Sequence, residues 1–461
     1  MTRLQHAASF RDPSGFVFSE NGILYRQVNR EYQPHYDRLM SSGLYDELVR
    51  KGWLVPHDEV DAAAGHGDAY RILRPERIPY ISYPYEWCFS QLRAAALLTL
   101  DIQILSLARG MTLKDASAYN IQFIGCRPVF IDTLSFETYD EGTPWVAYRQ
   151  FCQHFLAPLA LTAHVDGRLR RLLTTYVDGI PLDLASSLLP ARTRLRPGLL
   201  AHIHMHASSQ RRHQDAGASG AQPVPSLSKP RLLALLENLR ATVQRCAIRP
   251  GRSTWSHYYE DTNYSTNAME AKASLVRRLV DLVARPGEVI HDIGANTGRF
   301  SRLLAGSGRY VVSHDIDELA VERNFHETRA EHAHGVLPLV LDLANPSPSI
   351  GWALDERMSA LERLQGGTVV ALALVHHLAI GNNVPLPQLA DLFGRIARGL
   401  VIEFVPREDS QVRRLLATRR DIFGGYTVDA FEHAFRTSFD VVAREDIPGT
   451  CRTLFAMRRR E

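Results

Sequence analysis

Three acidic residues in the C-terminal half of the chain each end an apolar run, and a short glycine loop follows the first of them. Asp292 closes "EVIHD", Asp315 closes "VVSHD" and Asp342 closes "LVLD". The carboxyl ends of parallel strands meet at one edge of a sheet, and a carboxylate at the second strand end accepts hydrogen bonds from both hydroxyl groups of a ribose. The spacing therefore predicts a nucleoside site, although any one of the three acids could instead cap a helix.

The loop after the first run reads "GANTG", with glycines at 294 and 298. Gly294 allows a sharp turn and the close approach of a ligand, and Gly298 allows the next helix to pack close to the strand. Asn296 stands where nucleotide-binding loops commonly carry a third glycine, and asparagine tolerates left-handed backbone angles better than most residues. The missing glycine counts against a dinucleotide, although an ordinary strand-to-helix turn can also carry such a loop.

Segments of strand length alternate with helical stretches over the last part of the chain. The first five are separated by helical stretches, which predicts parallel strands covered on both faces. The last two are separated only by "IPGTCR", which predicts an antiparallel hairpin. The expected fold is α/β, a doubly wound, Rossmann-like, seven-stranded sheet with a final antiparallel strand. The seven predicted strands are 288–294, 309–316, 337–344, 368–377, 399–406, 439–446 and 453–459.

The motifs "HDIGANTGRFS", "SHDID", "LDLA" and "ALVHHL" resemble those of the class I S-adenosylmethionine-dependent methyltransferases, over about the last 200 residues. S-adenosylmethionine carries no pyrophosphate, which agrees with the missing third glycine. The resemblance implies that the glycine loop binds the methionine end of this cofactor. The residues that it assigns to the cofactor are Asp292, Gly294, Asn296 and Gly298 at the methionine end, Asp315 and Ile316 at ribose and adenine, Asp342 and Leu343 at the adenine edge, and Leu374 and Val375 beside the sulfonium.

Methyl transfer from a sulfonium is an in-line displacement, so the protein mainly aligns donor and acceptor, and a base helps when the acceptor is a hydroxyl or a protonated amine. His376 and His377 follow the fourth strand, and either could be that base or be hydrogen-bonded to a neighbouring loop. Glu403 ends the fifth strand, where it could bind the acceptor or cap a helix. The aromatic residues between Trp255 and Tyr264 could close over the cofactor as a lid or pack in a core.

A second set of polar residues lies in the N-terminal half. Asp115 and Asn120 are five apart, and Asp132 ends the hairpin candidate that follows, "IQFIGCRPVFID". This order resembles the small-molecule kinases related to aminoglycoside phosphotransferases, and it implies a phosphotransfer site that uses ATP and Mg²⁺. The chain departs from that family, because no glycine-rich phosphate loop is present and Arg26 stands near the position of the strand lysine. The alternative is a substrate-recruiting domain in which "DASAYN" is an ordinary turn.

A stretch rich in Ala, Ser, Gly, Gln and Pro over residues 206–231 divides the chain, because it contains too few large apolar residues to form a core. We expect a kinase-like or substrate-recruiting domain at 1–205 and a flexible linker at 206–229. We expect the methyltransferase domain, with a helical extension at its start, at 230–461.

The composition is that of a soluble globular protein, with 45% hydrophobic and 22% charged residues among 461. The net charge of +3 gives no reason to expect nucleic acid. The five cysteines form no CxxC pair, which argues against a metal site and suits a reducing cytoplasm. The N-terminus lacks a signal-peptide core, and no stretch looks long and apolar enough to span a membrane. We therefore expect a cytoplasmic protein without a membrane partner.

The leading hypothesis is an S-adenosylmethionine-dependent methyltransferase that acts on a small-molecule, saccharide or carrier-bound acceptor. One alternative is a bifunctional enzyme, or a phosphotransferase, that uses ATP in the N-terminal domain. Another is a non-catalytic scaffold that binds one of these ligands. The sequence leaves open the acceptor, the methylated atom and the oligomeric state.

Overall fold

The computed structural model describes residues 3–60, 67–207, 226–248, 266–417 and 420–460. The chain forms two compact units, each described by itself. Unit 1 comprises Met1–Phe123, Arg127–Pro250 and Ser349–Arg357. Unit 2 comprises Ile124–Cys126, Gly251–Pro348 and Met358–Glu461.

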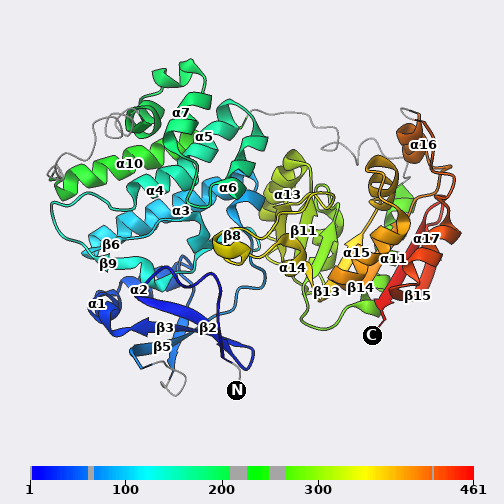
Figure 1. Ribbon diagram of the computed structural model, residues 1–461, viewed down its shortest axis with the longest axis horizontal. Coiled ribbons are helices and arrows are strands. Elements are labelled where there is room, and N and C mark those ends of the chain that lie inside the picture. Colours follow the sequence, from blue (N-terminus) through cyan, green and yellow to red (C-terminus); the bar gives the residue numbers. More distant parts are fainter. Residues whose placement is uncertain (1–2, 61–66, 208–225, 249–265, 418–419, 461) are drawn as a thin grey trace. The chain divides into compact units, whose positions relative to one another are not determined.

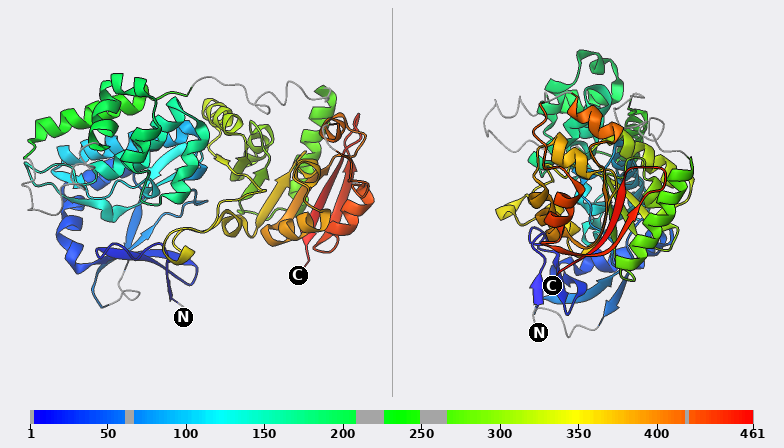
Figure 2. Two further views of the ribbon diagram at one scale, coloured as in Figure 1. Left: turned by 45° about the horizontal axis from the view of Figure 1, so that its top comes forward. Right: turned by 90° about the vertical axis from the view of Figure 1, so that its right-hand side faces the viewer.

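Unit 2 is built on one seven-stranded sheet (Figure 1, Figure 2). Its strands, in spatial order, are β12 (Val336–Val340), β11 (Val311–Asp315), β10 (Ile290–Ile293), β13 (Gly367–Ala371), β14 (Ala397–Phe404), β16 (Thr453–Arg459) and β15 (Phe439–Asp446). The first five pair in parallel, whereas β16 is antiparallel to both β14 and β15. The predicted doubly wound sheet with a reversed last strand is confirmed, and its strand order reverses between β10 and β13.

Helices cover both faces of this sheet. They are α11 (Thr266–Val283), α12 (Arg299–Ala305), α13 (Glu318–Ala330), α14 (Ala360–Leu364), α15 (Leu386–Ile396), α16 (Ser410–Leu416) and α17 (Val428–Phe435). Successive residues of a strand point to opposite faces. Val369 and Ala371 of β13 accordingly join the core beneath α15 and α17, whereas Val370 joins the core beneath α11 and α12. Because both faces are covered, the five parallel strands are buried along nearly their whole length, whereas β15 at the edge of the sheet is partly exposed.

Unit 1 begins with a five-stranded antiparallel sheet. Its strands, in spatial order, are β1 (Arg3–Gln5), β2 (Gly15–Glu20), β3 (Ile23–Asn29), β5 (Ala69–Pro75) and β4 (His57–Val60). Asn21 and Gly22 join β2 to β3 with φ of 53° and 80°, which is the hairpin turn that an Asn-Gly pair favours. The helices α1 (Gln33–Ser41) and α2 (Leu44–Arg50) lie between β3 and β4 in the chain.

The rest of unit 1 is mostly helical and surrounds the long helix α3 (Phe89–Ala108). The predicted hairpin is present as β7 (Ile121–Ile124) and β8 (Arg127–Phe130), and β6 (Met111–Leu113) pairs with β9 (Phe136–Thr138). Further helices are α4 (Tyr148–Phe151), α5 (Ala157–His164), α6 (Leu172–Thr175), α7 (Leu182–Leu188), α8 (Pro197–Leu199) and α10 (Lys229–Arg245).

Helix α3 corrects one expectation from the sequence. By length and composition it is apolar enough to cross a membrane, and it is the only such helix in the part of the chain that the structure describes. However, 61% of its most apolar window is buried inside the protein, and a core helix meets the same criteria.

The helix α10 belongs to unit 1, although the sequence analysis placed residues 230–461 in one domain. Arg240 of α10 donates a hydrogen bond to Asp101 of α3 at 2.7 Å, and the apolar face of α10 is buried in this unit. An amphipathic pattern shows that a helix needs an apolar partner but does not say which one. Residues 208–225 of the expected linker and the expected aromatic lid at 255–264 lie outside the described residues.

A short segment of the C-terminal half, Ser349–Arg357, also belongs to unit 1. Arg11 donates two hydrogen bonds of 2.9 Å, from Nε and Nη2, to the buried carboxylate of Glu356. The tip of the β7–β8 hairpin, residues 124–126, belongs instead to unit 2. Local sequence patterns do not predict these two assignments, because they depend on contacts between residues far apart in the chain.

Candidate active site

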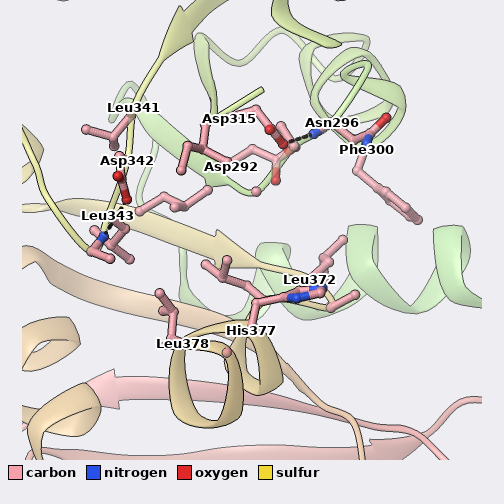
Figure 3. Close-up of a pocket in the computed structure, with 18 of the residues that line it drawn as sticks. Asp292, Asn296, Phe300, Asp315, Leu341, Asp342, Leu343, Leu372, His377 and Leu378 are labelled. Carbon is pink, nitrogen blue, oxygen red and sulfur yellow. Dashed lines mark hydrogen bonds between the residues drawn. The ribbon is translucent and has the colours of Figure 1, made fainter. Parts of the chain in front are cut away.

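A cavity of about 400 Å³ lies in unit 2 at the carboxyl ends of β10, β11, β12 and β13 (Figure 3). This is the edge at which a doubly wound sheet binds its ligands, and the volume is in the range of small-molecule sites. Eight of the ten residues assigned to the cofactor line it, namely Asp292, Gly294, Asn296, Asp315, Ile316, Asp342, Leu343 and Leu374. The lining does not include Gly298 or Val375.

The glycine loop has a left-handed backbone at three positions. The φ angles are 80° at Gly294, 52° at Asn296 and 76° at Gly298. Asn296 thus adopts the conformation that a third glycine would adopt. At Gly298 a Cβ atom would lie 2.1 Å from Oδ1 of Asn324 on α13. The close approach that requires glycine is therefore to α13, and not to the strand as we expected.

Asp292 and Asp315 lie side by side on one wall of the cavity (Figure 3). The Ser301 hydroxyl donates to Asp292 at 2.6 Å. The backbone N–H groups of Asn296 and Asp317 donate to Asp315 at 2.7 and 2.9 Å. Burial raises the pKa of each carboxyl to about 6, and the charge of Asp315 contributes to the shift of Asp292.

Two buried carboxyl groups whose pKa values are raised by burial are stabilised as anions by a cation that enters the cavity. The ammonium and sulfonium groups of S-adenosylmethionine are such cations, and its ribose hydroxyls can donate to Asp315. The residues that line the cavity therefore fit this cofactor. At the other end, Asp342 accepts a hydrogen bond from the N–H of Ala344 at 3.0 Å, beside the apolar side chain of Leu343.

The residues predicted at the end of the fourth strand do not all face the cavity. Leu374 and His377 line the cavity, whereas Val375 and His376 are fully buried and are not part of the lining. Val375 belongs to the hydrophobic core, so it does not flank the site where the sulfonium is expected. Burial lowers the pKa of His377 to about 4, with a contribution from Arg452, so its imidazole is neutral at pH 7.

His376 is a buried histidine that the cavity does not reach. Neither of its ring nitrogens has a hydrogen-bond partner among the described residues. Burial, together with the nearby charges of Arg452 and Lys272, holds its pKa well below the usual value. Of the two candidate bases, only His377 is placed to touch a ligand.

Glu403 is completely buried and is not part of the cavity lining. Its carboxylate accepts hydrogen bonds from Lys272 Nζ at 2.6 Å, from the Ala373 N–H at 2.9 Å and from Arg452 Nη1 at 3.3 Å. Glu403 therefore belongs to a buried network of charged residues and does not lie at the edge of the cleft, where we expected it.

Sequence reasoning missed Lys272, which lies on α11 and lines the cavity. Its signal was present: it falls three residues after Met269 and four before Val276, both on the buried face of the helix. A lysine on an apolar helix face is buried only with a partner, so this position pointed to an internal acid.

The polar residues predicted in unit 1 do come together. The Asn120 amide donates to the Ser135 hydroxyl at 3.2 Å, and the charge of Asp132 adds to burial in raising the pKa of Asp115. Although burial raises the pKa of Asp132, the guanidinium of Arg26 and the hydrogen bonds from Ser135 and the Leu134 N–H together hold that pKa below its usual value. Asp132 also accepts hydrogen bonds from the Ser135 hydroxyl and from a backbone N–H group.

Comparison with known proteins identifies one relative over nearly the whole chain. No family model matches the sequence. The nodulation protein NoeA of Rhizobium meliloti (strain 1021) is 36% identical over 468 aligned positions, which cover 99% of this chain and 96% of NoeA.

Solved structures that match part of the chain include methyltransferases. The N-methyltransferase NodS from Bradyrhizobium japonicum WM9 is 14% identical, with a TM-score of 0.30 and coverage of 43% of this chain and 99% of NodS. The magnesium protoporphyrin IX methyltransferase ChlM from Synechocystis PCC 6803, solved with bound SAH, is also 14% identical, with a TM-score of 0.30 and coverage of 45% and 93%.

The bifunctional kinase-methyltransferase WbdD is 13% identical, with a TM-score of 0.30, and the match spans 44% of this chain and less than half of WbdD, 41%.

The relationship to NoeA extends through both units at an identity that establishes common ancestry. The chain belongs to the family of the nodulation protein NoeA.

Proposed function

We propose that this protein is an S-adenosylmethionine-dependent methyltransferase whose cofactor binds in the cavity of unit 2. The observation that carries the proposal is the pair Asp292 and Asp315, two buried carboxyl groups with raised pKa values beside a left-handed glycine loop. Such a pair is costly to keep without a cationic ligand.

In this proposal, Asp292 holds the ammonium group of the cofactor and Asp315 holds the two ribose hydroxyls. Leu343 and Ile316 pack against the adenine, and Leu374 lies beside the sulfonium. The cofactor supplies a methyl group that is already activated, so these residues mainly fix its position and exclude water. The neutral imidazole of His377 can accept a proton from the acceptor as the methyl group is transferred.

The acceptor is proposed only as a class. We propose a small molecule, a saccharide or a carrier-bound intermediate, because the net charge of +3 offers no basis for nucleic acid. Incubation of cell extracts with the purified protein and methyl-labelled S-adenosylmethionine would identify the acceptor as the molecule that becomes labelled.

Isothermal titration calorimetry with S-adenosylmethionine tests the cofactor site directly. The wild type should bind, and Asp315→Asn should bind at least tenfold more weakly, because a charge-assisted hydrogen bond contributes about 1.5–3 kcal/mol. Asp391→Asn is the matched control, since it removes the same charge from an exposed position of α15 outside the cavity. Wild-type protein that does not bind the cofactor would rule out the proposal.

For unit 1 we propose a kinase-like fold that recruits the acceptor and does not transfer phosphate. Its support is the antiparallel sheet of five strands together with the clustering of Asp115, Asn120 and Asp132. As arranged, these residues do not fit Mg·ATP, because Arg26, Ser135 and a backbone N–H already occupy the oxygens of Asp132.

Calorimetry with Mg·ATP separates this proposal from a bifunctional enzyme. We expect no binding by the wild type. Binding of Mg·ATP that is lost in Asp132→Ala would contradict the proposal and favour phosphoryl transfer.

A further inference from the structure

The turn after β13 has a strained backbone where it lines the cavity. Ala373 has a φ of 51°, in the left-handed region that residues with a Cβ atom disfavour. The free-energy cost corresponds to a population about 5- to 30-fold lower than in the right-handed region. Ala373 and its neighbours Leu372 and Leu374 line the cavity, so the conformation of this turn shapes the wall beside the expected sulfonium. Strain at such a position persists only when surrounding contacts enforce it.

One buried carboxylate holds this turn. Oε2 of Glu403 accepts a hydrogen bond from the Ala373 N–H at 2.9 Å and another from Lys272 Nζ at 2.6 Å. Oε1 of Glu403 faces Arg452 Nη1 at 3.3 Å. Both oxygens therefore have cationic partners, which fix the carboxylate in one orientation.

The network continues to a fourth charged residue. Arg452 donates from Nε and Nη2 to the two oxygens of Asp409, at 2.8 and 3.1 Å. Two cations and two anions thus alternate, and each of the four residues is at most 8% exposed. Buried charges cost free energy unless each is paired, and a network that is fully paired specifies one geometry.

We propose that Glu403 is a positioning residue, whose carboxylate, held by Lys272 and Arg452, fixes Ala373 in its left-handed conformation and thereby shapes the cofactor site. This inference rests on the proposed methyltransferase function. From the sequence we expected Glu403 to bind the acceptor or cap a helix. In this proposal it acts instead through its hydrogen bond to the backbone of Ala373.

A competing explanation is that Lys272 binds the ligand directly, since it also lines the cavity. Two double variants separate the explanations while keeping the buried charge balanced, because each removes one cation and one anion and leaves Arg452 paired with Asp409. Lys272→Met/Glu403→Gln keeps an amide oxygen that can accept from the Ala373 N–H. Lys272→Met/Glu403→Leu removes that acceptor.

The experiment measures the Kd of S-adenosylmethionine by calorimetry. We expect Lys272→Met/Glu403→Leu to bind about tenfold more weakly than Lys272→Met/Glu403→Gln, because only the leucine variant lets the turn relax to ordinary backbone angles. Both variants lack Lys272, so the comparison between them isolates the acceptor for the Ala373 N–H. Adding Ala373→Gly to the leucine variant should restore most of the affinity, since glycine adopts this φ without penalty. Hydrogen–deuterium exchange should be faster around residue 373 in the leucine variant only.

Each result is decisive. Rescue by glycine shows that the leucine variant still folds and that the turn is what it lost. Equal affinities of the glutamine and leucine variants would overturn the inference while leaving the proposed function intact. If that shared affinity were far below that of the wild type, Lys272 itself would contribute to ligand binding. A wild type that does not bind the cofactor would refute the proposed function, and the inference would fall with it.

Discussion

The raised pKa values of Asp292 and Asp315 predict that cofactor affinity depends on pH in a range where ordinary aspartates do not titrate. Both values are about 6, because burial penalises the charged form. A cationic ligand needs the deprotonated form, so the affinity should be near its maximum at pH 7 and weaken as the pH falls through 6. An aspartate with its usual pKa near 3.9 would stay ionised over the same range.

The magnitude follows from the fraction of each carboxyl that is protonated. A group with a pKa of 6 is about 10% protonated at pH 7 and about 90% at pH 5, which weakens binding about tenfold. If both carboxylates must be ionised, the loss approaches 100-fold. Because the two groups interact, the titration belongs to the pair, and we expect a loss between about 10- and 100-fold.

Calorimetric titration of S-adenosylmethionine at pH 7.0, 6.5, 6.0, 5.5 and 5.0 measures this dependence below the pKa of the cofactor's own amino group, which lies near 8. Asp292→Asn should bind weakly at pH 7 and show a flatter profile, because one titrating group is gone. Asp391→Asn should follow the wild type. An affinity that stays constant between pH 7 and pH 5 in the wild type would refute the reasoning.

Three further predictions concern stability. Gly298→Ala should destabilise unit 2 by at least about 3 kcal/mol, because φ is positive there and the new Cβ atom would lie 2.1 Å from Asn324 Oδ1. Gly306→Ala, at a φ of −58°, should be nearly neutral. Thermal unfolding compares the two variants, and similar melting temperatures would contradict the structure. Burial lowers the pKa of His291 to about 3, so below pH 6.5 this residue is protonated in the unfolded state but not in the folded state. The free energy of unfolding should therefore fall by about 1.3 kcal/mol between pH 7 and 5.5. Urea unfolding of His291→Gln should show a smaller loss over the same range. Arg26→Met should lower the stability of unit 1 by about 3 kcal/mol, because it leaves the charge of Asp132 without its cationic partner. Arg26→Met/Asp132→Leu should recover that stability. Equal melting temperatures for the wild type and the single variant would show that the ion pair contributes nothing.

The sequence alone predicted the sheet of unit 2 and one wall of its cavity. Apolar runs separated by helices favour parallel strands covered on both faces, and the carboxyl ends of such strands meet at one edge. Asp292 and Asp315 were therefore predictable as neighbours, although they are 23 positions apart. Asn296 was predictable as well, because few residues other than asparagine and glycine accept a left-handed backbone.

The tertiary structure decided which side chains at the other strand ends face the cavity. Neighbouring residues point in different directions once a strand gives way to a turn, so His377 reaches the cavity and His376 does not. Glu403 follows the same pattern as the other acids at strand ends, but two cations and a backbone amide enclose it. One of those cations, Lys272, comes from a helix 131 positions earlier in the chain.

The sequence by itself determined the order of the elements, the sheet edge at which the cavity lies and the loop that tolerates asparagine, because all three depend on local backbone chemistry and on periodicity. Only the tertiary structure decided that α10 and Ser349–Arg357 belong to unit 1 and that Lys272 pairs with Glu403. Those outcomes depend on which apolar face or buried charge finds a partner far along the chain. Local patterns show that a partner is needed, and packing selects which one it is.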